Sequence, residues 1–330
     1  MTIDRERLAA LAAEPHFHRG KYRNLEPVPR HGLGDFLRWQ LAPGRRFPQG
    51  KRYTLLRPDG HLLMNPPAKP QLVWLGHASF LFQHRSLNVL TDPVLSDRAS
   101  PFRLVGPRRF TPPALTVAEM PPIHLVLISH NHYDHLDEAT VRQLHQRFGA
   151  NLCFCIPKGL RRWFEKRGIH NLVELDWWQS TPLAGKNEVF CLPAQHFSGR
   201  TATDTNTSLW CSWLLEMDGF RFYFGGDTGY GQVFRDIGEL FAPIDLALLP
   251  IGAYDPRWFM APVHVAPEEA VRIHQDIGAR QSVAMHWGTF VLTDEPMDEP
   301  PRRLRLALER QGISELAFRV MQHGEVWSRQ

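Results

Sequence analysis

The run from His130 to His135 constrains this chain more than any other part of its sequence. It reads His-Asn-His-Tyr-Asp-His and follows an apolar segment, residues 123–128, that is typical of a buried strand. Three imidazoles and one carboxylate at a strand end are costly to bury without a partner. Because both groups are ligands that zinc and similar divalent cations prefer, the run predicts a metal site.

Three further potential ligands lie far along the chain, each just after a short apolar segment. They are His196, Asp227 and His286. Strands that end at one edge of a sheet present such side chains to a shared crevice, so we expect these residues to meet the run at 130–135. The full set could hold two ions that share one ligand. The first ion is assigned His130, His132 and His196, the second Asp134, His135 and His286, and both share Asp227.

The ordered ligand set resembles the metallo-β-lactamase superfamily. Within it, the runs Gly-Ala-Tyr-Asp-Pro-Arg-Trp-Phe-Met at 252–260 and His-Trp-Gly-Thr-Phe at 286–290 are similar to the N-acyl-phosphatidylethanolamine-hydrolysing phospholipases D. The likeness extends from about Gln71 to Phe290 and is weak outside these limits. We therefore expect an N-terminal extension, residues 1–70, that packs on a metallohydrolase domain, residues 71–330.

The resemblance implies a fold and a reaction. The fold is the α/β class in its metallo-β-lactamase αββα form, with two packed mixed β-sheets and outer helices, and the order of predicted strands and helices fits it. The reaction is binuclear, zinc-dependent phosphodiester hydrolysis of the phospholipase D type, which converts N-acyl-phosphatidylethanolamine to N-acylethanolamine and phosphatidic acid. Manganese or iron would fit the same ligands. The resemblance also implies a homodimer.

Two other functions stay open from the sequence. One is a phosphodiesterase or lactonase that acts on small soluble or cyclic substrates with the same metal centre. The other is a metal-binding scaffold without turnover, although an intact ligand set argues against it. No nucleic-acid partner is expected, because the sequence lacks aromatic residues interleaved with a long basic stripe.

Composition limits the setting of this chemistry. The chain has 330 residues, a formal net charge of +4 and no run of about 18 apolar residues that could span a bilayer. Its start lacks the apolar stretch of a secretory signal, and its four cysteines contain no Cys-x-x-Cys pair. We therefore expect a cytoplasmic protein whose mild positive charge permits peripheral contact with an anionic membrane.

Three residues outside the ligand set are predicted to act at the site. Asp92, in Thr-Asp-Pro, matches the superfamily's first motif and is expected to orient the run at 130–135, with a simple turn residue as the alternative. His77 is expected to hydrogen-bond at the sheet end. His264 precedes a predicted helix, where it either donates to the substrate or caps the helix. The residues predicted to be catalytic are Asp134, Asp227 and His264.

The segment from Tyr254 to Met260 mixes aromatic side chains with one arginine and has no helical or strand periodicity. We expect it either to receive acyl chains, with Arg257 near the lipid head group, or to fill the gap between the sheets. The residues predicted to bind substrate are Tyr254, Arg257, Trp258, Phe259 and His264.

Local signals predict several elements around these residues. Asp137 is a predicted N-cap for a helix over 138–148, and proline with two glutamates begins a helix over 267–277. The run Met217-Asp218-Gly219 predicts a hairpin turn between strands at 209–216 and 220–224. Other predicted elements are a strand at 151–156 and a helix at 302–311.

Overall fold

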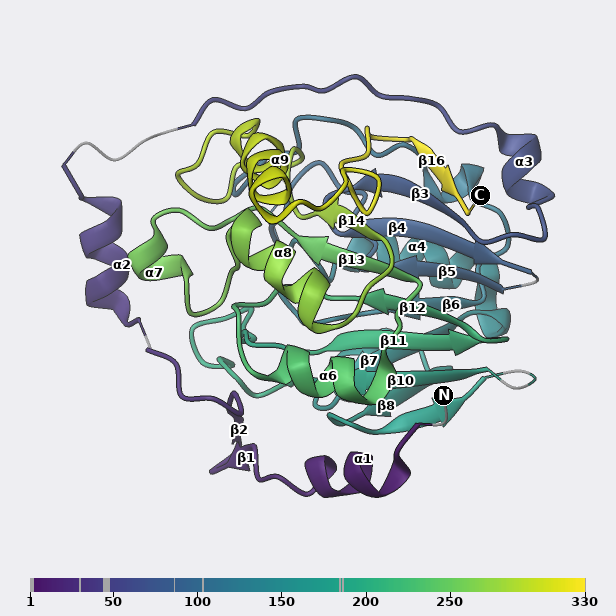
Figure 1. Ribbon diagram of the computed structural model, residues 1–330, viewed down its shortest axis with the longest axis horizontal. Helices are drawn as coiled ribbons and strands as arrows, with labels where there is room; N and C mark the ends of the chain where they lie inside the picture. The colour runs from purple at the N-terminus through teal and green to yellow at the C-terminus, as the bar shows by residue number, and fades with distance from the viewer. Residues whose placement is uncertain are drawn as a thin grey trace.

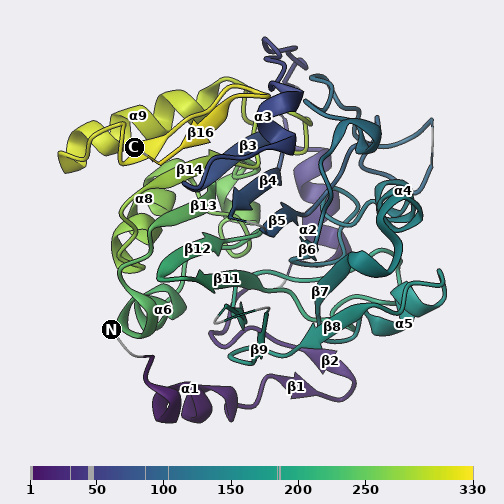
Figure 2. The same cartoon turned by 90° about the vertical axis from the view of Figure 1, so that its right-hand side faces the viewer.

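Two β-sheets lie face to face at the centre of the molecule, and helices cover the outer face of each (Figures 1 and 2). The computed structural model describes residues 3–29, 31–43, 48–85, 87–102, 104–183, 185 and 187–329. Within these ranges each sheet has seven strands. This arrangement of layers confirms the predicted αββα class.

The first sheet has the strand order β16-β3-β4-β5-β6-β7-β8. Strands β5 to β8 run parallel, whereas β16, β3, β4 and β5 pair antiparallel. Alternate side chains point to opposite faces, so Trp74 packs between the sheets while Val73 faces the outer helices. The strand bounds are β3 (Gln71–Gly76), β4 (Ser79–His84), β5 (Leu87–Thr91), β6 (Leu125–Leu127), β7 (Cys153–Pro157), β8 (Leu172–Leu175) and β16 (Val326–Ser328).

The second sheet has the order β15-β14-β13-β12-β11-β10-β9, with β12 to β15 parallel and β9 to β12 antiparallel. The turn between β11 and β12 has φ of 48° at Asp218 and 80° at Gly219. Two positive φ values match the twist of a two-residue hairpin, so that prediction is confirmed. The strand bounds are β9 (Ser180–Pro182), β10 (Glu188–Leu192), β11 (Ser212–Met217), β12 (Phe220–Phe224), β13 (Leu246–Pro250), β14 (Ser282–Met285) and β15 (Phe318–Arg319).

Different helices cover the two sheets (Figure 2). Helices α4 (Glu138–Phe148) and α5 (Arg161–Glu165) cover the first sheet, and α6 (Val233–Phe241), α8 (Pro267–Asp276) and α9 (Glu299–Gln311) cover the second. The Asp137 side chain accepts a hydrogen bond from the Ala139 amide at 3.2 Å, so the predicted N-cap is confirmed. Within the described ranges, no helix has the length and apolar character needed to cross a membrane.

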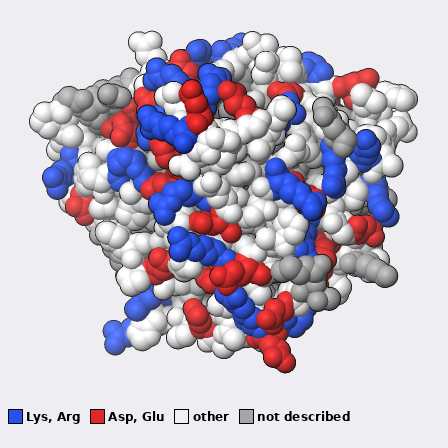
Figure 3. Space-filling view, in the orientation of Figure 1, with Lys and Arg blue, Asp and Glu red and all other residues white. Residues whose placement is uncertain are grey.

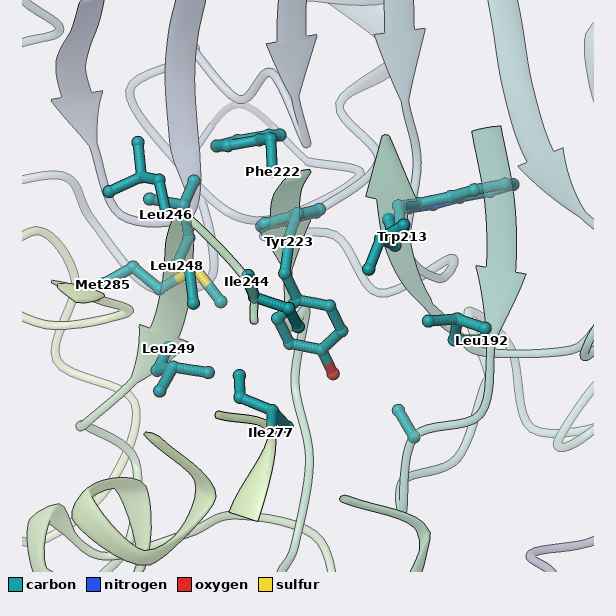
Figure 4. Packing of buried hydrophobic residues seen from close by; sticks show 14 of the residues in the cluster. Leu192, Trp213, Phe222, Tyr223, Ile244, Leu246, Leu248, Leu249, Ile277 and Met285 are labelled. Carbon is teal, nitrogen blue, oxygen red and sulfur yellow. The ribbon is translucent and has the colours of Figure 1, made fainter. Parts of the chain in front are cut away.

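Aromatic and aliphatic side chains fill the space between the layers. Phe82 of β4 stacks on Phe222 of β12, with ring centroids 4.3 Å apart. Phe222 and its neighbour Tyr223 point to opposite sides of the second sheet, so β12 contributes to packing on both of its faces (Figure 4). Because this close packing fixes where each strand ends, it also fixes the loops that carry the predicted ligands.

The segment before β3 runs along the outside of the sandwich. Its elements are α1 (Arg5–Ala12), β1 (Phe17–His18), β2 (Lys21–Tyr22), α2 (Leu33–Gln40) and α3 (Gly60–Met64). Within it, residues 16–29, here called the N-terminal strap, lie at the lower edge of the sheets in both ribbon views (Figures 1 and 2). Helices and strands in this segment were not predicted from the sequence, and its division from the rest of the chain at Pro70 stays a prediction.

Several element bounds differ from the prediction. The strand expected at 151–156 begins at Cys153, because a 3-10 turn, Gly149–Asn151, precedes it. The helix expected at 302–311 begins at Glu299, since prolines are tolerated in a first helical turn. Within the segment expected to lack helical structure, Arg257–Met260 forms the one-turn helix α7. Strands β8 and β9 and a 3-10 turn at Val117–Glu119 were not predicted.

The N-terminal strap is tied to the domain by a histidine, and this tie predicts a pH dependence. His16 Nε2 lies 2.7 Å from Asp176 Oδ1, and Lys158 Nζ lies 2.9 Å from the other oxygen. Burial by itself lowers the pKa of His16, but the hydrogen bond to Asp176, the hydrogen bond to the Glu14 carbonyl oxygen and the charge of Asp176 together raise the pKa above its ordinary value. The stabilisation is therefore fully present below about pH 6.5 and is lost as pH rises through the higher folded-state pKa.

We expect backbone amide hydrogens of the strap near His16 to exchange with solvent faster at pH 9 than at pH 6. The difference should correspond to about 1 kcal/mol in the free energy of local opening. The measurement is hydrogen exchange corrected for its intrinsic pH dependence. His16→Asn should remove the difference, whereas His170→Asn, at an exposed position, should keep it. Equal protection at both pH values in the unaltered protein would contradict this account of the tie.

Candidate metal centre

The seven predicted ligands converge at one end of the two sheets. The run at 130–135 follows β6, while His196, Asp227 and His286 follow β10, β12 and β14. Five of the seven residues are buried, and His132 and Asp134 are partly buried, with 14% of the Asp134 side chain exposed. The structure therefore brings the seven residues together at one end of the sheets, where they were expected to meet.

One group of three imidazoles matches the first predicted ion site. His130 Nε2 lies 2.8 Å from His132 Nδ1, and His196 Nε2 lies 3.2 Å from the same atom. Three ring nitrogens that approach one point this closely form a pocket for a small cation.

The second group lies beside the first. Asp134 Oδ2 is 3.5 Å from His135 Nε2 and 3.4 Å from His286 Nε2. His77 Nε2 lies 3.0 Å from the same carboxylate oxygen. These four residues form a second cluster whose ligand atoms are close enough to hold one ion.

Asp227 lies between the two groups. Its Oδ2 is 3.0 Å from His135 Nε2 and 3.1 Å from His286 Nε2 in the second group. The same oxygen is 3.9 Å from both His130 Nε2 and His196 Nε2 in the first group. This is the position that a ligand shared by two ions requires.

Hydrogen bonds on the outer side of the rings turn ligand lone pairs inward. His196 Nδ1 lies 2.8 Å from the carbonyl oxygen of Val263, which can only accept, so in the neutral ring the proton is on Nδ1. His135 Nδ1 lies 2.6 Å from Asp92 Oδ2, with the same consequence. In the neutral form of each ring, Nε2 would therefore be the unprotonated nitrogen and would face the centre, as a metal ligand must.

The electrostatics of the centre favour positive charge. Burial by itself lowers the pKa of His135, but the carboxylates of Asp227 and Asp134 raise it well above its ordinary value. Burial opposes ionisation of Asp134 and Asp227, yet the neighbouring imidazoles hold both pKa values well below the usual range. Two buried carboxylates that stay ionised create a field that a bound cation would neutralise.

Asp92 and His77 take the supporting positions predicted for them. Asp92 binds His135 and also accepts hydrogen bonds from the amide and hydroxyl of Ser129, so it joins the end of β6 to a candidate ligand. Burial lowers the pKa of His77 to about 3, so the ring is neutral and its Nε2 can donate to Asp134. The simple turn alternative for Asp92 does not account for these three bonds.

Backbone geometry marks the same place. His77, Asp92 and His286 have φ values of 55°, 29° and 61°, a region that residues other than glycine rarely adopt. Gly226, before Asp227, has φ of 59°, and a Cβ there would lie 2.8 Å from Ser129 Cβ. Strain and close approach thus occur beside candidate ligands, and glycine at position 226 lets the Asp227 loop come this near to Ser129.

A family model described as "Beta-lactamase superfamily domain" matches residues 87–287, which include all seven candidate ligands. The chain belongs to the beta-lactamase superfamily. It is 38% identical over 265 residues, 77% of this chain and 74% of the relative, to N-acyl-phosphatidylethanolamine-hydrolyzing phospholipase D 1 of Caenorhabditis elegans. It is 39% identical over 316 residues, 91% of this chain and 81% of the relative, to an uncharacterized protein of Mycobacterium tuberculosis.

Solved structures agree with this assignment at the level of the fold. A metallo hydrolase from the archaeon Ignicoccus hospitalis has a TM-score of 0.60 and 21% identity, and the match covers 79% of this chain and 99% of that one. With the family model and the relative of 38% identity, the chain is a metallohydrolase of the beta-lactamase superfamily. The match to the mycobacterial protein covers 91% of this chain, more than residues 71–330 could supply. The expectation of a likeness confined to Gln71–Phe290 was therefore too narrow.

Arg200 holds the turn at 130–135 in place, and the sequence did not predict this role. Its guanidinium donates to the carbonyl oxygens of Asn131 at 2.8 Å and Leu136 at 2.7 Å, and it lies 3.9 Å from the Tyr133 ring centroid. It therefore bridges both ends of the turn that carries four candidate ligands. No local sequence signal indicates such a contact between residues more than 60 positions apart.

We expect Arg200→Lys to weaken metal retention by roughly tenfold, because one ammonium group cannot reproduce the planar, two-ended contact. The measurement is bound metal as a function of chelator concentration, with thermal unfolding to show that the fold is kept. Arg142→Lys, on the exposed face of α4, is the matched control. An unchanged chelator midpoint would show that Arg200 does not position the turn.

Asn24 of the N-terminal strap supports another candidate ligand and was also missed. Its side chain donates to the His196 carbonyl oxygen at 3.0 Å and accepts from the His196 amide at 3.1 Å. Asn24 Oδ1, which accepts from the His196 amide, also accepts from Trp210 Nε1 at 2.9 Å. The strap thus lies directly against the candidate metal centre, although no sequence signal placed residues before Gln71 there.

Two residues predicted to bind substrate are engaged elsewhere. Tyr254 is buried, and its hydroxyl donates to Glu299 Oε1 at 2.8 Å, so its prediction as a substrate contact was wrong. Arg257 forms an ion pair with Glu269 at 2.8 Å and donates to the carbonyl oxygen of His264, also at 2.8 Å. The guanidinium therefore positions the His264 segment, and a direct contact with a lipid head group does not follow from its geometry.

Trp258 and Phe259 face the surroundings of the site. Trp258 is 44% exposed, and the Arg38 guanidinium lies 5.0 Å from its ring centroid. Phe259 stacks on His31 at 4.6 Å and lines a cavity that reaches His196. These two residues retain the predicted position for contact with apolar parts of a substrate.

His264 lies over the metal centre. Its ring centroid is 5.0 Å from that of His196, and its Nδ1 lies 4.0 Å from Asp227 Oδ2 and has no hydrogen-bond partner among the described residues. The helix-capping alternative fails, because the N-cap of α8 is Ala266 and its amide is bound by Glu269. Burial lowers the pKa of His264 well below its ordinary value, so the neutral ring is suited to donate one hydrogen bond.

Proposed function

We propose that the chain is a binuclear phosphodiester hydrolase that cleaves N-acyl-phosphatidylethanolamine to N-acylethanolamine and phosphatidic acid. The observation that carries this proposal is the position of Asp227 between a three-histidine group and an Asp-His-His group, beside a cavity with apolar walls. The name of the Caenorhabditis elegans relative supports the choice of substrate.

The candidate ligands fit two zinc ions. The donor set combines five imidazoles with two carboxylates, outer hydrogen bonds present the ring lone pairs, and the local field favours cations. Manganese or iron would accept the same donors. The groups that would hold the first ion are His130, His132 and His196, those for the second are Asp134, His135 and His286, and Asp227 would be shared.

Ions in these sites would activate a water molecule and stabilise charge on the phosphoryl group. In the overall reaction, the water oxygen forms a bond to phosphorus and the bond from phosphorus to the ethanolamide oxygen breaks. The ethanolamide oxygen gains a proton, and the second water proton is released. Asp134 and Asp227 remain ionised throughout and orient the centre, while His264 Nδ1 donates a hydrogen bond to the departing oxygen.

A lipid substrate requires access from a membrane surface, and α2 provides an apolar face for it. Leu37 and Leu41 are 47% and 78% exposed, and with Trp258 they line an open groove of about 610 Å³. Figure 3 shows Lys and Arg mixed with Asp and Glu on the visible face, without the large basic area that nucleic acid would need. The homodimer implied by the resemblance stays a prediction.

We expect the double variant Leu37→Glu/Leu41→Glu to bind phosphatidylethanolamine–phosphatidylglycerol vesicles at least roughly tenfold more weakly, because it places charge on an inserted apolar face. Vesicle co-sedimentation measures the effect. Leu316→Glu is the control, because Leu316 is 67% exposed and does not line the groove. Unchanged partitioning of the double variant would remove the membrane contact from the proposal.

The function is tested with metal-replete protein and N-acyl-phosphatidylethanolamine in ¹⁸O-labelled water. We expect both products, with the label in phosphatidic acid, because water attacks phosphorus. Hydrolysis confined to bis(p-nitrophenyl) phosphate or to lactones would instead favour the alternative function on small or cyclic substrates. If metal-replete protein hydrolysed none of these compounds, the chain would be a binding scaffold and the proposal would fail.

A further inference from the structure

The N-terminal strap closes a cavity against the metal centre. The cavity has a volume of about 690 Å³, within the range of roughly 300–1,000 Å³ typical of small-molecule sites. Strap residues form one wall, and the segments that carry two site histidines, His196 and His264, form the other.

The cavity lining combines apolar and basic side chains. The apolar ones come from the strap, from the residue after His196, from α7 and from the loop after α7. They include Leu25, Pro27, Val28, Phe197, Phe259 and Val263. Arg19, Lys21 and Arg23 also line the cavity, are exposed and have no acidic partner within 4 Å in the described part of the chain. An occupant with an apolar body therefore fits this cavity.

The strap wall is held in place by specific bonds. Besides the contacts of Asn24 with His196, the Tyr22 amide donates to the carbonyl oxygen of Asn206 at 2.8 Å, and the Gln232 amide donates to the Glu26 carboxylate. Val28, between these anchors and α2, partly buries an apolar side chain toward the cavity. A preformed wall lets the cavity discriminate between occupants of different length.

The position of His264 indicates which part of the substrate would enter the cavity. Val263 lines the cavity, and its carbonyl oxygen binds His196, whose ring lies against that of His264. If His264 donates to the departing oxygen, the group attached to that oxygen extends away from the metal centre on this side. In the proposed reaction, that group is the N-acylethanolamine.

We propose that the strap cavity binds the fatty acyl chain of the N-acylethanolamine leaving group, and that Val28 helps to set the chain length accepted. This inference rests on the proposed function for its choice of ligand. It assigns substrate selectivity to residues before Gln71, outside the region that carries the metal ligands.

The test uses a fluorescent product analogue, parinaroyl ethanolamide, with the metal-replete full chain. We expect one bound probe per chain, with affinity roughly tenfold lower in Val28→Trp, because the indole fills space that the chain needs. Val28→Ala should shift the preference among N-acyl phospholipids toward longer chains. Leu316→Trp, outside the cavity, controls for the added indole, and thermal unfolding of each variant shows that the fold is kept.

The outcomes separate this inference from the proposed function. Probe binding that Val28→Trp weakens, without hydrolysis of any N-acyl phospholipid, supports the cavity assignment and rejects the proposed function. Hydrolysis with the same chain-length profile in the unaltered protein and both Val28 variants overturns the cavity assignment and keeps the function. No probe binding to the unaltered protein also overturns the assignment, whatever substrate is hydrolysed.

Discussion

Asp227→Asn is expected to lower kcat for phosphodiester hydrolysis by about 10³-fold and to reduce the bound metal per chain. Asp227 Oδ2 lies within 3.9 Å of ring nitrogens from both groups. An amide removes the negative charge that two cations would share, and a loss of about 4 kcal/mol of transition-state stabilisation corresponds to this factor. The measurements are steady-state kinetics and elemental analysis of the same preparation.

The matched control is Asp236→Asn on α6, which removes a carboxylate that pairs with Arg7 far from the site. It should retain the activity and metal content of the unaltered protein. If Asp227→Asn kept two ions and turned over within about tenfold of the unaltered rate, Asp227 would not be a shared ligand.

His264→Ala should slow cleavage of alkyl phosphodiesters by about 10²-fold, the usual cost of losing one hydrogen-bond donor to a developing oxyanion. The effect should be much smaller for bis(p-nitrophenyl) phosphate. Nitrophenolate is a weakly basic leaving group that needs no hydrogen-bond donor. The oxygen of the departing ethanolamide is strongly basic and does need one. The measurement is kcat for both substrate classes at saturating concentration.

His170→Ala, at an exposed position, controls for the loss of an imidazole elsewhere. An equal loss of kcat on both substrate classes would indicate that His264 acts on the shared phosphoryl group or on the metal centre. Full turnover of both would remove it from the reaction.

Sequence reasoning located the ligand set because its signals are local. Each candidate ligand follows a strand that hydrophobic runs identify, and strands packed in one sandwich must end near one another. Asp137 and the Asp218-Gly219 turn were equally accessible, since caps and hairpins depend on neighbouring residues.

Residues that act through long-range contacts could not be found in this way. Arg200 and Asn24 bind backbone atoms of distant segments, and nothing beside them in the sequence marks that role. Tyr254 was misassigned for a related reason: an aromatic side chain in a loop fits a pocket or a buried cluster equally well until its hydroxyl partner, here Glu299, is known.

Anomalous diffraction from crystals of the metal-replete protein, recorded on both sides of the zinc absorption edge, tests the central claim most directly. We expect two peaks per chain, one within about 2.0–2.2 Å of ligand atoms of His130, His132 and His196 and one equally close to Asp134, His135 and His286, with Asp227 reaching both. A chain that holds no stoichiometric metal, or holds it away from Asp227, would contradict the account.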